Sequence, residues 1–160
     1  IFSDAASAIL ISKSKKNNIG PFELGADGSG ADALELPTGT NEIIMNGAKV
    51  LTFAMDVVPN NVNKLLKKIK YKKDKIDKFI FHQASKYILD NINRRLSIKK
   101  NKTFENYGKV GNTISASIPI ALKDANIKGK ISAKNNIIVA GYGVGLSWGS
   151  ALLKWNKILW

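Results

Sequence analysis

The chain has 160 residues, of which 44% are hydrophobic and 23% charged, and its formal net charge is +13. These proportions exclude a disordered or fibrous chain, and a chain of this length most often forms one domain. Cysteine is absent, which excludes disulfides, zinc–thiolate sites and a thiol nucleophile supplied by this chain. No run approaches the roughly 20 apolar residues of a membrane span and no export signal is visible, so we expect a cytoplasmic protein without a membrane partner.

The first eleven residues are apolar and rich in small side chains, which predicts a buried strand. A natural chain seldom opens in the middle of a core strand, and the first residue is Ile rather than Met. We therefore expect a piece of a longer protein. A polar turn at 12–18 and an irregular, glycine-containing excursion at 25–40 follow.

A helical pattern runs from residue 47 to 69, with apolar side chains at steps of three and four. Pro59 falls inside this pattern and is expected to kink the helix or divide it in two. The apolar strand predicted at 79–81 leads directly to His82, and Ser85 is suited to cap the next helix.

Asn112 is expected to open a further helix after a glycine-containing turn. Residues 137–140 form the continuous apolar run of a buried strand, and a last strand is predicted from 146 to 155. Strands that alternate with helices and end in a strand pair indicate a single α/β domain with helices on both faces of a sheet.

His82 is the only imidazole of the chain. A lone histidine often has a structural role, but this one follows a strand and precedes a helix N-terminus, where open α/β sheets bind ligands. The positive end of that helix disfavours an imidazolium, so we expect a neutral ring that donates a hydrogen bond.

Asn112 is either a simple helix cap or an uncharged amide donor of the kind that stabilises oxyanions. The glycines of residues 141–149 could bring backbone N–H groups close to a ligand, although their spacing is not that of a dinucleotide site. The 12 acidic residues show no metal-ligand spacing, so no metal is expected.

Most of the positive charge comes from lysine, with Arg94 and Arg95 as the only arginines. Eight lysines lie between Lys64 and Lys78, with Tyr71 as the one aromatic residue among them. This composition does not favour nucleic acid, which is better read by arginine and aromatic side chains. It fits a solvated surface, with an acidic protein or a phosphate-bearing partner as the alternative.

Four segments in order resemble motifs of the β-ketoacyl-acyl-carrier-protein synthase III family, and the interval of 30 residues from His82 to Asn112 also fits. The segments are IFSDAASA at 1–8, FHQAS at 81–85, YGKVGNTISASIPIAL at 107–122 and GYGVGLSWGSA at 141–151. The resemblance implies a thiolase fold of two similar α/β halves, each with a mixed five-stranded sheet and helices on both faces. Residues 1–160 would be the C-terminal half, and the N-terminal half with the nucleophilic cysteine would be absent from this chain.

The resemblance also implies an acyltransferase of fatty acid biosynthesis that carries out a decarboxylative Claisen condensation. An acyl group from acyl-CoA would load the cysteine of the other half, and malonyl-carrier protein would be decarboxylated to an enolate. His82 and Asn112 would stabilise the enolate oxygen, and the backbone N–H of Val144 would hold the acyl carbonyl. No cofactor is implied beyond the CoA and carrier-protein thioesters, and the isolated chain is expected to be inactive.

By the same resemblance, Gly47, Leu51, Ala84 and Ser85 would surround the pantetheine arm, and Tyr142 would lie beside the malonyl group, where the family has Phe.

Lys86, Arg94 and Arg95 would meet the acidic carrier protein, and the complete enzyme would be a homodimer. The alternatives are an acyltransferase or polyketide-type condensing relative on the same fold, or an inactive subunit that docks the carrier.

Overall fold

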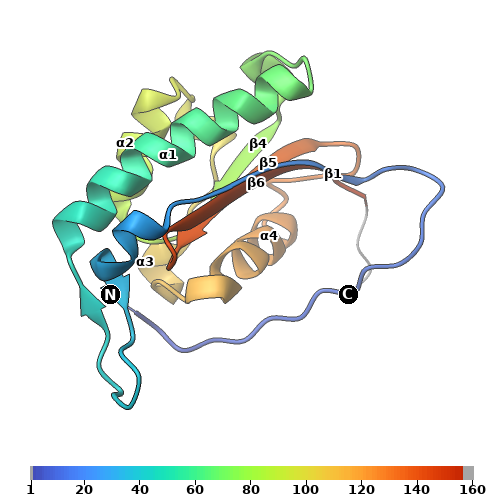
Figure 1. The fold of residues 1–160 in the computed structure, drawn as a ribbon. Coiled ribbons are helices and arrows are strands. Elements are labelled where there is room, and N and C mark those ends of the chain that lie inside the picture. The colour runs from blue at the N-terminus through green and yellow to red at the C-terminus, as the bar shows by residue number, and fades with distance from the viewer. Residues whose placement is uncertain (1, 157–160) are drawn as a thin grey trace.

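The computed structural model describes residues 2–156 and forms an α/β fold (Figure 1). Its main sheet has the strand order β1–β6–β5–β4, in which β4 and β5 are parallel and the other neighbours antiparallel. The strands are β1 Ile19–Ala26, β4 Lys78–Phe81, β5 Asn136–Gly143 and β6 Ser147–Lys154, and a separate small pair is formed by β2 Leu34–Glu35 and β3 Ile44–Met45. The helices are α1 Gly47–Lys68, α2 Lys86–Arg95, α3 Tyr107–Val110 and α4 Ser117–Ile127.

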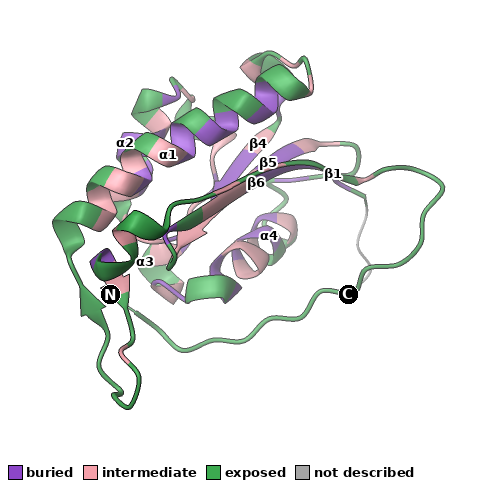
Figure 2. Ribbon diagram, viewed as in Figure 1, coloured by how far each residue is buried: buried purple, intermediate pink, exposed green. Residues whose placement is uncertain are grey.

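Helices α1 and α2 lie on one face of the sheet and α4 lies on the other (Figure 1). Because successive side chains of a strand point to opposite faces, β4 contributes to two separate cores. Phe79 and Phe81 pack in the cluster that includes residues of α1 and α2, whereas Ile80 packs with residues of α4. The buried residues therefore follow the centre of the sheet and the helix faces toward it (Figure 2), and the predicted layered α/β architecture is confirmed.

Helix α1 is a single helix of 22 residues, so the expected division at Pro59 is wrong. Asn46 caps its N-terminus by accepting a hydrogen bond from the backbone N–H of Lys49, at 3.1 Å. Pro59 is buried beside Val58 and Val62 on the face that packs on the sheet. We infer that this packing offsets the backbone hydrogen bond that proline cannot donate.

The main sheet has four strands rather than the expected five. At the free edge of β4 the chain forms only an isolated parallel bridge between Phe79 and Thr103. The chain then enters α3 at Tyr107 without forming a further strand, and the expectation of a fifth strand is wrong.

Residues 2–11 do not form the buried strand that their composition predicts, and Ile1 lies outside the described residues. The segment runs apart from the sheet and is exposed throughout, with Leu10 at 96% (Figures 1 and 2). It contacts the domain through a bridge between Phe2 and Asn112. An apolar segment becomes a buried strand only where a neighbouring strand pairs with its backbone groups, and among residues 2–156 no strand pairs along this one.

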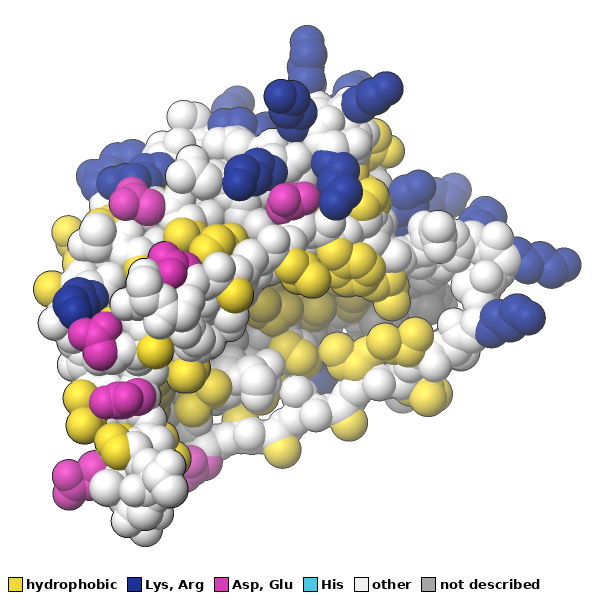
Figure 3. All heavy atoms as spheres, in the orientation of Figure 1, with side chains coloured by type: hydrophobic (Ala, Val, Ile, Leu, Met, Phe, Trp, Pro, Cys, Tyr) yellow, Lys and Arg dark blue, Asp and Glu magenta, His cyan; other side chains and the backbone are white. Residues whose placement is uncertain are grey.

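Space-filling atoms show hydrophobic side chains around a hollow between the sheet and this first segment, while Lys and Arg side chains gather on the opposite, upper side (Figure 3). No helix within residues 2–156 combines the length and the apolar character needed to cross a bilayer.

Candidate active site

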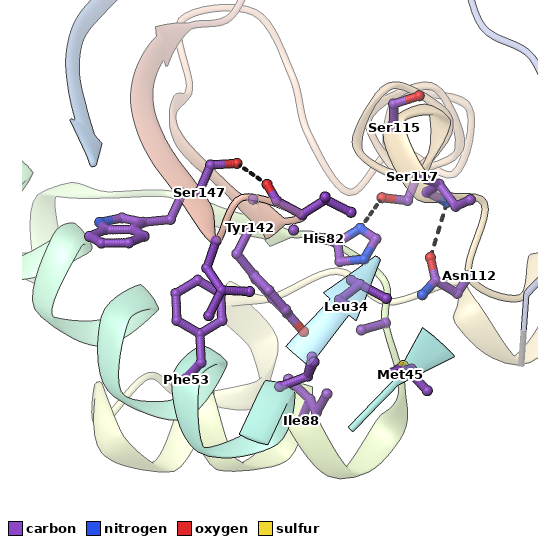
Figure 4. A pocket seen from close by; sticks show the side chains of 18 of the residues that line it. Leu34, Met45, Phe53, His82, Ile88, Asn112, Ser115, Ser117, Tyr142 and Ser147 are labelled. Carbon is purple, nitrogen blue, oxygen red and sulfur yellow. Dashed lines mark hydrogen bonds between the residues drawn. The ribbon is translucent and has the colours of Figure 1, made fainter. Parts of the chain in front are cut away.

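A cavity of about 830 Å³ opens at the carboxyl ends of the two parallel strands (Figure 4). His82 directly follows β4, and Gly141, Tyr142 and Gly143 end β5. Because parallel strands end at the same edge of a sheet, these residues meet at one place although they lie 60 residues apart in sequence. The predicted position of a ligand site next to His82 therefore coincides with a real cavity.

Two hydrogen bonds hold His82 in place, one to its backbone and one to its side chain. Its backbone N–H donates to the carbonyl of Ala140 at 2.9 Å, which continues the β4–β5 ladder by one residue. Its Nδ1 lies 2.7 Å from the Oγ of Ser117, the first residue of α4. Burial lowers the pKa of His82 to about 4, so the ring is neutral at pH 7. The expectation of a neutral ring agrees with this value, but the cause is burial rather than the neighbouring helix end.

Gln83, the next residue, ties this corner of the sheet to the loop before α3. Its Nε2 donates to the carbonyl of Phe81 at 2.7 Å, and its Oε1 accepts the backbone N–H of Asn106 at 2.9 Å. Asn106 in turn donates to the carboxylate of Asp124 on α4, also at 2.9 Å. This chain of buried hydrogen bonds fixes the loop that leads to Asn112 relative to β4.

Asn112 reaches the cavity because Gly111 turns the chain with a positive φ of 74°, a conformation that favours glycine. Its side-chain oxygen accepts the backbone N–H of Ile114 at 3.0 Å, so its amide nitrogen is left to face the cavity beside His82 (Figure 4). Ile114 itself has φ 52°, which strains a β-branched residue. A 3-10 helix at Ile114–Ala116, with Thr113 as its N-cap residue, leads directly into α4, so helical structure begins just after Asn112, although Asn112 is not the cap of α4.

Val144 lies in the turn between β5 and β6, lines the cavity and is 62% exposed. The hydroxyl of Ser147 donates to its carbonyl at 2.7 Å, which fixes the turn. The glycines on either side let the backbone rather than side chains border the cavity here, as the sequence predicts.

The aromatic ring of Tyr142 packs against the imidazole of His82. Its ring meets that of His82 edge-on, with centroids 5.3 Å apart, and Phe53 of α1 packs against its other side at 6.0 Å. The Tyr142 hydroxyl is buried without a hydrogen-bond partner in the described part of the chain, and burial raises its pKa. The ring therefore acts as an apolar surface that limits the access of water to His82.

The structure brings together every residue expected to be catalytic or to bind substrate. All of them line this one cavity: His82, Asn112 and Val144, with Gly47, Leu51, Ala84, Ser85 and Tyr142. Ser85 also caps α2, as predicted, by accepting the backbone N–H of Ile88 at 3.4 Å.

The sequence reasoning missed two parts of the cavity. Ser117 gives no local signal, because its contact with His82 spans 35 residues of sequence. The other part, here called the apolar wall, consists of Leu34, Leu36, Ile43 and Met45 from the small β2–β3 pair and its connection. These side chains lie in or next to the stretch expected to be an irregular excursion, and each of the two apolar runs is too short to indicate a structure.

Lys86, Arg94 and Arg95 lie on α2, outside the cavity lining. Each has an intramolecular partner: Lys86 is paired with Asp90, Arg94 donates to the side-chain oxygen of Asn91, and Arg95 lies 2.6 Å from Asp56 of α1. Within residues 2–156, no cluster of three His, Cys, Asp or Glu side chains could hold a metal ion.

Comparisons with known proteins agree with the geometry. Residues 66–155 match the family model described as the C-terminal part of 3-oxoacyl-[acyl-carrier-protein] synthase III. The chain is 36% identical over 158 residues to a β-ketoacyl-[acyl-carrier-protein] synthase III of Staphylococcus aureus (strain Newman), covering 98% of this chain and 50% of that protein. The chain thus spans about half the length of the curated relatives it matches.

Solved structures of the same kind superpose closely. The 3-oxoacyl-[acyl-carrier-protein] synthase III of Aquifex aeolicus VF5 has a TM-score of 0.85 and 32% identity, over 90% of this chain and 47% of that one. The corresponding protein of Thermus thermophilus has a TM-score of 0.83 and 34% identity, over 91% and 48%. The thiolase-like fold expected from the resemblance is confirmed by these neighbours.

Proposed function

Since its family model matches more than half of the residues, this chain belongs to the 3-oxoacyl-[acyl-carrier-protein] synthase III family, and we propose that it acts as the C-terminal catalytic half of such an enzyme. The other half would supply the cysteine that this sequence lacks. Together the halves would condense an acyl group on that cysteine with a malonyl group on a carrier protein.

The proposed reaction has two steps in which electrons move without an external oxidant or reductant. The bond between the malonyl carboxylate and the α-carbon breaks, carbon dioxide leaves, and the electron pair forms an enolate of the thioester. The enolate carbon then attacks the acyl thioester carbonyl, and the cysteine thiolate leaves. Negative charge develops first on the malonyl thioester oxygen, so the demand on this half is to stabilise that oxygen.

His82 and Asn112 meet that demand with two uncharged donors. A neutral imidazole and a carboxamide each offer an N–H group to a developing oxyanion in a site of low polarity, where such hydrogen bonds are strong. A protonated imidazole would also attract the malonyl carboxylate and oppose its departure as carbon dioxide. The depressed pKa of His82, which keeps the ring neutral, therefore suits decarboxylation.

The observation that carries the proposal is the convergence of these two donors on one face of the cavity. Asn112 has its oxygen occupied by Ile114 and its nitrogen unbonded within the described residues. His82 has its Nδ1 occupied by Ser117, so only Nε2 remains for a ligand. The backbone N–H of Val144, across the cavity, is the proposed donor to the acyl-cysteine carbonyl.

For the carrier protein we propose the exposed basic side chains of α2, which are Lys86, Arg94 and Arg95. The Arg95–Asp56 pair is about half exposed on both sides, and an exposed ion pair is weak. An acidic partner could therefore replace Asp56 and Asp90 as the counter-charge at little cost.

The test uses the protein that contains both halves, with malonyl-carrier protein and an acyl-CoA. Wild type should release carbon dioxide and form the 3-oxoacyl product. His82→Ala and Asn112→Ala should each slow carbon dioxide release by roughly 10²–10³-fold, as expected for loss of one oxyanion donor. Both variants should still acylate the cysteine, because that step does not use the enolate site.

Asn112→Asp is a matched variant, since it keeps the shape of the side chain while replacing the donor nitrogen by oxygen. It should be at least as impaired as Asn112→Ala. Acyl transfer by wild type without release of carbon dioxide would overturn the condensation and assign an acyltransferase instead. Absence of both acylation and decarboxylation in wild type would favour an inactive carrier-docking subunit.

A further inference from the structure

Ser117 is the residue whose place in the site is not explained by contact with a substrate. It is 2% exposed, at the first position of α4, and its Oγ lies 2.7 Å from His82 Nδ1. The same Oγ lies 3.5 Å from the backbone nitrogen of Gln83. Both neighbours belong to the turn that follows β4, so one hydroxyl bonds two consecutive residues.

The direction of these hydrogen bonds follows from the chemistry of the groups. A backbone N–H can only donate, so Ser117 Oγ accepts from Gln83. A buried hydroxyl hydrogen requires an acceptor, and His82 Nδ1 is the one within reach among the described residues. Ser117 therefore donates to Nδ1, and Nδ1 carries no proton.

We infer that Ser117 is a positioning residue that fixes the tautomer of His82, so that the proton resides on Nε2 and faces the cavity. A neutral imidazole has one protonated and one unprotonated nitrogen. With Nδ1 committed to accepting from Ser117, Nε2 must be the N–H donor (Figure 4). In the opposite tautomer, Nε2 would present a lone pair to the cavity and repel an oxyanion.

This role rests on the proposed function of His82 as an oxyanion donor. It explains why the Nε2 atom of the ring, rather than Nδ1, carries the proton. The Tyr142 ring, which itself packs against Phe53, contacts the imidazole edge-on and limits where it lies. Neither contact distinguishes the two tautomers. The Ser117 hydroxyl is the group in the described structure that does.

Nitrogen-15 NMR of the imidazole tests the inference directly. The chain has a single histidine, and a His82→Gln variant identifies its signals in a protein with additional histidines. Wild type at pH 7 should show Nε2 as the protonated nitrogen and Nδ1 as the unprotonated one. Ser117→Ala should give a mixture of tautomers or the reverse assignment, whereas Ser117→Thr, which keeps the hydroxyl, should restore the wild-type pattern.

Ser150→Ala is the matched control, because it also removes a buried serine hydroxyl, one that has no hydrogen-bond partner among residues 2–156, and it should leave the tautomer unchanged. A protonated Nδ1 in wild type, or a Ser117→Ala spectrum equal to that of wild type, would overturn the inference. A Ser117→Ala protein that unfolds gives no native signals, and the wild-type assignment then decides alone.

The kinetic readout separates this inference from the proposed function. In the two-half protein, Ser117→Ala should lower kcat for carbon dioxide release by about tenfold with little change in KM, less than the loss of a donor itself. A wild-type protein without condensing activity would refute the function while the NMR result still stood. An Nε2–H tautomer in an active enzyme whose kcat is insensitive to Ser117→Ala would overturn the positioning role.

Discussion

The cavity has two sides that are built in opposite ways. His82, Asn112 and Ser117, which we call the site floor, are largely buried next to β4 and α4. Hydrogen bonds hold their polar atoms: His82 is bonded to Ser117, and Asn112 to the backbone of Ile114. The apolar wall lies on a two-residue strand pair whose side chains remain largely exposed, with Leu36 at 60% and Met45 at 42%.

The difference shows where the fold needs accuracy. A hydrogen bond to a developing charge depends on distances of a few tenths of an ångström, and only a packed sheet and helix hold atoms that well. Contact with an alkyl chain is not directional, so a short excursion that rests on the domain is sufficient. We therefore expect floor variants to change stability and kcat, and wall variants to change KM.

The largest expected effect is on the free energy of unfolding, for a substitution in the core that supports the site floor. Ile138 of β5 is fully buried among α1, α2 and β4, so Ile138→Ala should lower the free energy of unfolding by about 2–5 kcal/mol. Leu36→Ala in the wall should change it by less than about 0.5 kcal/mol. Urea unfolding of both variants measures the contrast, and equal losses would break the distinction between the two sides.

The next effect is a dependence of stability on pH that arises from the floor alone. His82 has a pKa of about 4 in the folded protein and about 6.5 in the unfolded chain. Between these values the unfolded chain binds the proton and the folded one does not, so stability is full above pH 6.5 and falls as the pH is lowered to 4. The total loss should be about 3 kcal/mol.

Urea unfolding at several pH values, with His82→Gln as reference, isolates this contribution. The variant lacks the titrating group, so the difference in unfolding free energy between it and wild type should change across this window. A constant difference would show that the ring is not buried as described.

In the wall, Met45→Ala should raise KM for the proposed acyl thioester substrate by about tenfold and leave kcat nearly unchanged. The reason is the loss of apolar contact with a flexible chain, without any change in the groups that meet the reacting atoms. Ile127→Ala is the control, because Ile127 is also an exposed apolar residue, at 64% against 42% for Met45, and lies on α4 outside the cavity lining. A drop in kcat with constant KM would place the wall in the chemistry.

The smallest effect concerns the strained residue that holds Asn112. Ile114→Gly should relieve the cost of its positive φ and raise the free energy of unfolding by up to about 1 kcal/mol. Ser97→Gly is the matched change, since Ser97 has the same φ of 52° far from the cavity. Only Ile114→Gly should also lower kcat, because it loosens the backbone N–H that orients Asn112. An equal kcat in both variants would show that the strain at Ile114 does not contribute to the site.

Sequence reasoning was accurate where a signal is local or carried by a motif. The apolar runs of β4 and β5, the cap at Ser85 and the position of His82 after a strand are of this kind. The resemblance to known condensing enzymes selected Gly47 and Leu51, which no periodicity distinguishes from other helical positions.

Long-range features were not accessible in the same way. The bond between Ser117 and His82, the continuation of α1 through Pro59 and the exposure of residues 2–11 all depend on what packs alongside a segment. The apolar composition of residues 2–11 predicts burial, but a strand also needs a neighbour, and composition contains no information about neighbours.

The bridge at the start of the chain has a mechanical consequence. The backbone N–H of Ser3 donates to the carbonyl of Asn112 at 2.9 Å, so the first segment is attached to the residue that presents the amide to the cavity. The rest of residues 2–11 lies away from the domain, so the segment contacts the site at its first residues and is exposed beyond them. A displacement of that segment would act on Asn112, the proposed oxyanion donor, through this hydrogen bond. The orientation of Asn112 therefore depends both on the domain core and on an exposed segment of the chain.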